Sequence, residues 1–349
     1  MMKKTLYLML TCCCMGSVCT LHAGNPDRQG EAGAYELLLN PWARSAGLHT
    51  MTTSMITGVE ATRLNVAGLA RLSKSELIIG HTILFDGTGM SLNSIGFAQR
   101  MGTSGAFGIT LTSMDFGDIP ITTDAIPEGT GASYSPSFFH MGLSYAHMFE
   151  NKVSVGILLC GISESIADLS AFGFALDAGV QYVAGEQDNF KFGIALRNVG
   201  SPMRFGGEGL SFQTPNPDSD VNYQITVNQR AAKFELPSVL NLGVSYDFLF
   251  GARHRFTIVG NFTANSFSRD QIGGGAEYAF KEMFMVRAGY KHELGSTEID
   301  KSIYTGFAAG VTLEVPTKKQ TTSRFGVDYA YGATSPFSGT HNFSIRYKI

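Results

Sequence analysis

Side chains of alternating character recur along most of this chain, and this period of two constrains the fold more than any other feature. From residue 76 to the carboxyl terminus, segments of about 10 to 14 residues alternate apolar with small or polar side chains. In residues 237–250, for example, Leu242, Val244 and Tyr246 alternate with Gly243 and Ser245. Because successive side chains of a strand point to opposite faces, each segment predicts a strand with one apolar face.

Counting these segments predicts a 14-stranded antiparallel sheet. The predicted strands are 75–85, 91–100, 103–116, 136–149, 151–162, 169–183, 189–199, 237–250, 254–265, 271–281, 283–293, 304–314, 322–332 and 340–349.

Loop lengths separate a membrane barrel from a soluble sandwich, whose strands also alternate. Connections after the even-numbered strands are mostly very short, whereas those after the odd-numbered strands include the long loops 117–135 and 200–236. An even number of strands with short turns at one end and long loops at the other is typical of outer-membrane barrels. Strands of about 9 to 11 residues suffice to cross a bilayer, and closure pairs every strand edge. We therefore predict an all-β fold, a transmembrane β-barrel over residues 75–349, with both termini at the periplasmic end.

The amino terminus predicts export. Two lysines precede an apolar run that ends in small residues at Ala23, as in a cleaved Sec signal peptide. The alternative, a retained anchor, needs roughly 20 uninterrupted apolar residues, and Gly16 interrupts this run. We predict a signal peptide over residues 1–23, cleavage near Ala23 and integration into the outer membrane. The remaining chain keeps only Cys160 and has no internal disulfide.

Residues 24–74 lack the alternation of the barrel wall. They begin as a polar linker and continue as a stretch rich in Ala, Gly, Thr and Met. We interpret them as a periplasmic or lumenal hatch segment, the alternative being a tail that hangs in the periplasm. Three consecutive glycines at 273–275 are a candidate place for a kinked or weakened strand, and hence for an opening in the wall.

Enzyme chemistry has little support in this sequence. The phosphate-binding loop, the His-Glu-x-x-His motif and the Gly-x-Ser-x-Gly elbow are all missing, and the histidines are scattered. A net charge of −3 argues against a nucleic-acid partner. We predict no enzyme activity, no catalytic residues, no cofactor and no metal site, with outer-membrane lipid as the surroundings of the barrel.

A set of short motifs then resembles a known family. One of them is Asn65-Val66-Ala67-Gly68-Leu69, in which Val66 replaces the family's usual proline. Further matches lie before and after this motif, in the order of the family. They are residues 36–39, 43–44, 58–61, 113–120, 128–131, 135–138, 163–168, 198–200, 203–205 and 235–237. This set resembles the PorV/PorQ family, whose barrels are similar in fold to those of FadL type.

The resemblance implies a function in the Bacteroidetes type IX secretion system. PorV-type members are shuttles that bind the C-terminal signal domains of secreted cargo after translocation and deliver them to the surface attachment complex. The implied partners are the type IX translocon and these cargo domains. A FadL-type channel for hydrophobic small molecules is the alternative, and the sequence does not separate the two.

Two groups of residues are candidates for a site. The partner-binding candidates lie in the long loops, where exposed apolar side chains can mark an interface or can fold over the lumen. The candidate hatch motif comprises Asn65, Gly68 and Leu69. The candidate partner-binding residues are Asp118, Ile119, Pro120, Ile126, Met203, Phe205, Phe212 and Tyr223.

Overall fold

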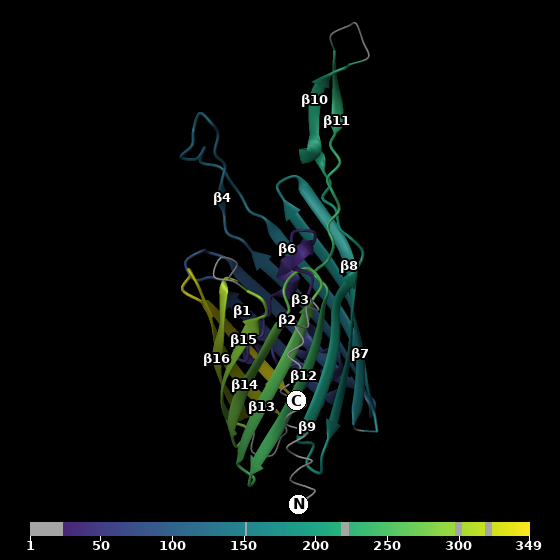
Figure 1. Ribbon diagram of the computed structural model, residues 1–349, viewed down its shortest axis with the longest axis vertical. Coiled ribbons are helices and arrows are strands. Elements are labelled where there is room, and N and C mark those ends of the chain that lie inside the picture. The colour runs from purple at the N-terminus through teal and green to yellow at the C-terminus, as the bar shows by residue number, and fades with distance from the viewer. Residues whose placement is uncertain (1–23, 151, 218–222, 297–301, 318–322) are drawn as a thin grey trace, which may run out of the picture.

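The computed structural model describes residues 24–150, 152–217, 223–296, 302–317 and 323–349. Within these ranges, 14 strands form one closed antiparallel barrel (Figure 1), which confirms the predicted fold. The predicted signal peptide lies outside the described residues, as do residues 151 and 322 of two predicted strands. The wall consists of β1 (Ser75–Ile83), β2 (Ser91–Met101), β3 (Gly105–Asp115), β6 (Ser137–Phe149), β7 (Val153–Ile166), β8 (Leu169–Ala184), β9 (Phe190–Gly200), β12 (Val239–Phe250), β13 (His254–Asn265), β14 (Gln271–Phe280), β15 (Phe284–Glu293), β16 (Tyr304–Pro316), β17 (Arg324–Thr334) and β18 (Thr340–Lys348).

Pairing of the first strand with the last closes the barrel. β1 and β18 run antiparallel from Glu76 opposite Lys348 to Ile83 opposite His341. The alternation seen in the sequence becomes the two faces of the wall: in β12, Val244 is exposed on the outside and Ser245 is buried inside. An apolar outer face on a sheet without free edges is what a bilayer requires.

The long loops carry two small sheets that we did not predict. The first pairs β4 (Ile119–Pro120) with β5 (Ser133–Tyr134), and the second pairs β10 (Ser211–Pro215) with β11 (Gln224–Asn228). Figure 1 shows β10 and β11 standing well above the barrel rim. We call this end of the barrel the long-loop end and the opposite end the short-turn end.

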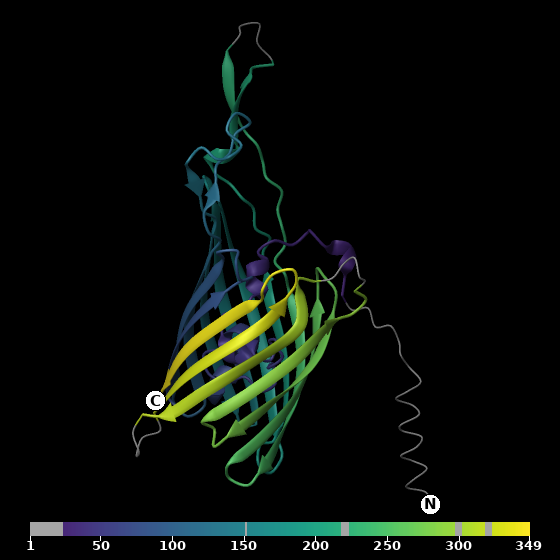
Figure 2. The same ribbon diagram turned by 90° about the vertical axis from the view of Figure 1, so that its left-hand side faces the viewer.

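Residues 24–74 enter the barrel at the long-loop end and run through its interior (Figure 2). Their first contacts join Gly24 to Asp270 and Gly33 to Glu235, both in connections at the long-loop end. The expectation that both termini lie at the short-turn end is therefore wrong for Gly24, although Ile349 does bond there to Ser75. The segment forms only short helices, namely η1 (Pro26–Arg28), η2 (Tyr35–Leu38), α2 (Ala43–Ala46), α3 (Ala61–Leu64) and η3 (Val66–Arg71).

We call residues 34–72 the lumenal segment. Trp42, Val59 and Leu69 pack with Ile78 of β1 in an apolar cluster, and each is almost fully buried. In the part of the chain that the structure describes, no helix is long and apolar enough to cross a membrane.

The glycines at 273–275 serve packing and do not open the wall. β14 pairs continuously with both neighbours across this stretch. A Cβ at Gly273 would lie 2.4 Å from the sulfur of Met51, and one at Gly275 would lie 2.8 Å from Leu48 Cδ2. These two glycines thus make room for the lumenal segment, and the predicted weak strand is wrong. The pairing of the wall is irregular elsewhere, between β8 and β9 at Leu176–Ala178 and between β16 and β17 at Tyr304–Ala308.

Candidate functional site

Half of the lumen, toward the long-loop end, is lined by apolar side chains. They come from β2, β3, β6, β7 and β8, from the connections that follow β1 and β3, from the lumenal segment and from the 200–236 loop. Barrels of this kind usually have a polar interior, so an apolar patch inside one needs an explanation. We call the set the outer apolar cluster. Its buried members are Ala34, Leu37, Val66, Leu84, Leu92, Met114, Phe138, Leu158, Cys160, Ile162, Ala171, Ala175, Met203 and Leu236, with Leu39, Phe85, Met90, Phe116, Phe205 and Phe234 partly buried beside them.

Among the barrel strands, β7 contributes the most residues to this cluster, and part of this strand is apolar on both faces. Leu158, Cys160 and Ile162 point into the lumen and are almost fully buried, whereas Ile157 and Leu159 are exposed on the outside. The outer face of the same stretch forms an apolar groove of about 270 Å³. The groove is lined by Phe139, Met141, Leu143, Leu159, Gly161, Ser163, Phe172 and Phe174. A single strand layer therefore separates two apolar environments.

The opposite half of the lumen carries buried charges, which we call the inner charge network. Arg287 donates to Glu277 over 2.8 Å, and Arg255 reaches the same carboxylate over 2.9 Å. Glu314 and Asp328 lie near the guanidinium of Arg346, each with an oxygen 3.3 Å from Nη2. These side chains come from β13 to β18 and are mostly buried, and their pairing offsets the cost of burial.

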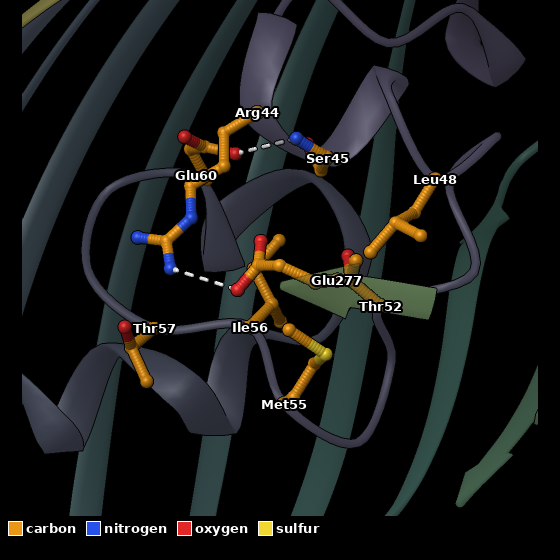
Figure 3. Close-up of a pocket in the computed structure, with 9 residues that line it drawn as sticks. All are labelled: Arg44, Ser45, Leu48, Thr52, Met55, Ile56, Thr57, Glu60 and Glu277. Atoms are coloured by element: carbon orange, nitrogen blue, oxygen red, sulfur yellow. Dashed lines mark hydrogen bonds and ion pairs between the residues drawn. The ribbon is translucent and has the colours of Figure 1, made fainter. Parts of the chain in front are cut away.

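The lumenal segment joins this network through Glu60 and Arg44. Glu60 Oε1 accepts a hydrogen bond from Arg346 over 3.2 Å, and Oε2 accepts one from the backbone N–H of Ser45 over 3.2 Å. Arg44 lies 4.0 Å from Glu277 (Figure 3). Burial lowers the pKa of Arg44, but the carboxylates around it outweigh that effect and leave the pKa above its ordinary value. One segment thus has an apolar side against β7 and a charged side against β14 and β18.

The cavity among these residues is small. It measures about 20 Å³ and is lined by the nine residues drawn in Figure 3, Glu60 and Glu277 among them. A space of this size holds roughly one water molecule, whereas an apolar cavity that binds benzene measures about 150 Å³. This cavity therefore has no room for a molecule the size of benzene.

Two arginines hold the segment at the boundary between the two halves. Arg63 donates to the carbonyls of Glu36 and Leu39, and Arg197 donates to that of Leu37. Burial and then the charge of Arg197 lower the pKa of Arg63 to about 9, so it stays cationic at neutral pH. Arg197 sits on the β9 side of the irregular pairing between β8 and β9, next to Asp177.

The predicted hatch residues lie in a closely packed part of the segment. Asn65 caps η3 by accepting from Ala67 N–H, and it donates to the carbonyls of Thr53 and Val180. Leu69 is fully buried in the apolar cluster around Trp42. A Cβ at Gly68 would lie only 2.1 Å from the carbonyl oxygen of Ile56, so this position has no room for a side chain.

One histidine of the segment is partly buried. His49 stacks edge-on against Tyr304 at a centroid distance of 5.9 Å. Burial, reinforced by the charge of Lys291, lowers the pKa of His49 to about 3. The histidine is therefore neutral at physiological pH.

The structure divides the predicted loop residues into two groups. Met203 is buried in the outer apolar cluster, and Phe205 packs on Phe234 beside it, with ring centroids 5.7 Å apart. These two residues fold over the lumen. The others are exposed on the two small sheets or their connections, away from the lumen: Asp118, Ile119, Pro120, Ile126, Phe212 and Tyr223.

The outer apolar cluster and the inner charge network were not predicted. The cluster had a visible signal, since residues 157–160 of β7 are apolar without interruption instead of alternating. The network had none, because its members are scattered from residue 44 to residue 346.

Comparison with known proteins agrees with this architecture. No family model matches the chain, and no curated protein matches it. Similar solved structures include the monoaromatic hydrocarbon channel CymD (TM-score 0.59, 14% identity, covering 89% of this chain and 97% of that one). The toluene transporter TodX of Pseudomonas putida (0.56, 13%, 88% and 97%) and a Pseudomonas aeruginosa FadL homologue (0.52, 12%, 88% and 97%) are also similar. The FadL-like fold is thus confirmed, whereas membership of the PorV/PorQ family stays a prediction.

Proposed function

We propose that this protein is an outer-membrane channel that admits hydrophobic small molecules. The observation that carries the proposal is the outer apolar cluster, which lies inside the barrel and directly beneath the long loops. An apolar molecule that leaves water for such a lining gains about 25 cal/mol for each Å² of apolar surface buried. A purely aqueous pore gives no reason to maintain apolar side chains on its inner wall.

Entry involves the partly buried members of the cluster. Phe205 and Phe234 cover the cluster from the 200–236 loop. Their rings contact each other and are held in place by apolar contacts. A solute displaces these rings and occupies space between Leu37 and β7. Further passage requires that the lumenal segment leave the inner charge network, since the cavity there is too small for an aromatic ring.

The comparisons support this proposal over a role in secretion. Two of the similar structures are a monoaromatic hydrocarbon channel and a toluene transporter. The likeness covers nearly the whole barrel, although at 14% identity or below it establishes fold alone. The solute class proposed here rests on the lining of this lumen.

Uptake into liposomes that contain the purified protein tests the proposal. We expect faster entry of a small apolar fluorophore such as N-phenyl-1-naphthylamine than into protein-free liposomes. Ile162→Ala removes a lining side chain and should reduce the protein-dependent uptake of the fluorophore severalfold. Leu159→Ala is the matched control, because it lies on the same strand but faces lipid. Equal uptake with and without protein, or equal effects of the two substitutions, contradicts the proposal.

A role in type IX secretion is the second candidate. It is supported by the exposed apolar side chains on the protruding loops, of which Phe212 is 51% and Tyr223 is 49% exposed. In this role the loops would bind cargo C-terminal domains and the translocon. Deletion of residues 211–228 should then leave cargo unattached at the cell surface, as surface proteomics would detect. Normal cargo display after this deletion argues against the role and leaves the channel proposal untouched.

A further inference from the structure

Gly24, the first residue that the structure describes, occupies a closely fitted site on the connection between β13 and β14. Its backbone nitrogen lies 2.6 Å from Oδ2 of Asp270. The Asp270 side chain is buried, and its other oxygen accepts a hydrogen bond from the backbone N–H of Asn265 over 3.1 Å. The carboxylate is therefore held in place with one oxygen directed at the nitrogen of Gly24.

The site excludes any side chain at position 24. A Cβ there would lie 2.7 Å from the carbonyl oxygen of Ser268 and 2.8 Å from the backbone nitrogen of Asp270. Both are backbone atoms, which cannot turn aside as the end of a side chain does. The site thus accepts glycine and places its nitrogen, rather than a side chain, against the carboxylate.

A second contact holds the following residues to the same connection. The guanidinium of Arg28 lies 4.3 Å from the ring centroid of Phe267, whose side chain is 6% exposed. Farther along, Gly33 N–H donates to the carbonyl of Glu235, and Glu235 N–H donates to that of Glu31. Residues 24–33 are thus attached at the long-loop end, ahead of the lumenal segment.

We propose that removal of the signal peptide converts this contact into an ionic anchor. Hydrolysis of the Ala23–Gly24 amide by a signal peptidase consumes one water and leaves a carboxylate on Ala23 and an ammonium on Gly24. The new α-ammonium then binds the Asp270 carboxylate where the amide nitrogen now lies. Hydrogen bonds between charged groups are shorter and roughly twice as strong as neutral ones, and the 2.6 Å separation suits such a pair.

The ion pair forms only if the signal peptidase cleaves directly before Gly24. Cleavage one residue earlier would place an alanine before Gly24 and move the charged amine away from Asp270. Cleavage one residue later would remove the nitrogen that the site holds. Only a chain that begins at Gly24 places a charged α-amine against the Asp270 carboxylate, whatever solute the barrel admits.

Chemical labelling of the α-amine tests this inference. An amine is reactive toward reductive methylation only in its neutral, accessible form, so a bound ammonium reacts slowly. In protein purified from outer membranes, mass spectrometry should find an N-terminal peptide that begins at Gly24. We expect Asp270→Asn to raise its labelling rate at pH 7.5 by about tenfold or more, since a hydrogen bond to a charged group contributes about 1.5–3 kcal/mol. Asp27→Asn is the matched control, because Asp27 is an exposed acid three residues after Gly24. Its amine should be labelled at the wild-type rate.

A second variant guards against misfolding of Asp270→Asn. Inserting one alanine after the cleavage point leaves Asp270 intact but displaces the amine, and it should label as fast as Asp270→Asn does. A mature chain that starts at another residue overturns the inference. So does a wild-type amine that labels as fast as that of the insertion variant.

Discussion

Replacing Glu60 by glutamine should release the lumenal segment from the inner charge network. The carboxylate uses both oxygens: one accepts from Arg346 on β18 and the other accepts from the backbone N–H of Ser45. Glutamine is nearly the same size but offers one oxygen and one NH₂ group. Either Arg346 or Ser45 therefore loses its acceptor and faces a donor instead.

The free-energy cost of Glu60→Gln depends on which carboxylates still contact Arg346. Removing one partner of a buried ion pair costs about 3–5 kcal/mol when the other charge is left alone. Arg346 keeps Glu314 and Asp328, so the loss should be closer to that of one charged hydrogen bond, about 2–3 kcal/mol. At 1.4 kcal/mol for each factor of ten, the undocked population of the segment rises about 30- to 150-fold.

Hydrogen exchange read by mass spectrometry measures this population. Amides of residues 43–47 and 58–64 should exchange faster by the same factor, while those of the barrel strands stay unchanged. Glu186→Gln is the matched control, because this glutamate is exposed in a short turn. Exchange of the segment within threefold of the wild type would show that Glu60 does not hold it in place, and the reasoning from the inner charge network would fail.

Two further substitutions should act on the same segment. Gly68→Ala places a methyl group 2.1 Å from the carbonyl of Ile56, so we expect at least tenfold faster exchange of residues 58–72 in a barrel that still shows heat-modifiable migration on gels. For His49, whose pKa falls from 6.5 to about 3 on burial, the neutral form is the docked one. Docking is therefore fully stable above pH 6.5 and weakens by about 1.4 kcal/mol for each unit of pH below it, down to about pH 3. Asn tolerates the positive φ of 50° at this position, so His49→Asn should exchange like the wild type at pH 7 and more slowly than it at pH 5.

The wall of the barrel could be predicted because its physical cause acts on every second residue. Lipid outside and a filled lumen inside impose the same period on all strands, and β12 shows it from residue 239 onward. The alternation of short and long connections then predicted that the sheet closes into a barrel, with short turns at one end and long loops at the other. Strand boundaries deviated where pairing continues past the membrane, as in β7, which extends to Ile166 instead of ending at 162.

The contents of the lumen could not be predicted in the same way. Which inward side chains meet depends on the closed barrel: Glu60, Glu314 and Arg346 lie far apart in the sequence and converge only in space. The path of residues 24–33 was likewise hidden, since a polar linker has no period and its anchoring partner, Asp270, lies 246 residues away.

The uneven lumen gives the lumenal segment two attachments of different physical kind. On the β7 side, Leu37 and Val66 bury apolar surface, which a hydrophobic solute can replace without loss of contact. On the β18 side, Glu60 is held by charged hydrogen bonds, which such a solute cannot replace. In the proposed channel, a solute in the outer apolar cluster weakens the first attachment and leaves the second, so the inner charge network would set the barrier to passage. Recognition of the solute and closure of the barrel would then lie in separate parts of one lumen.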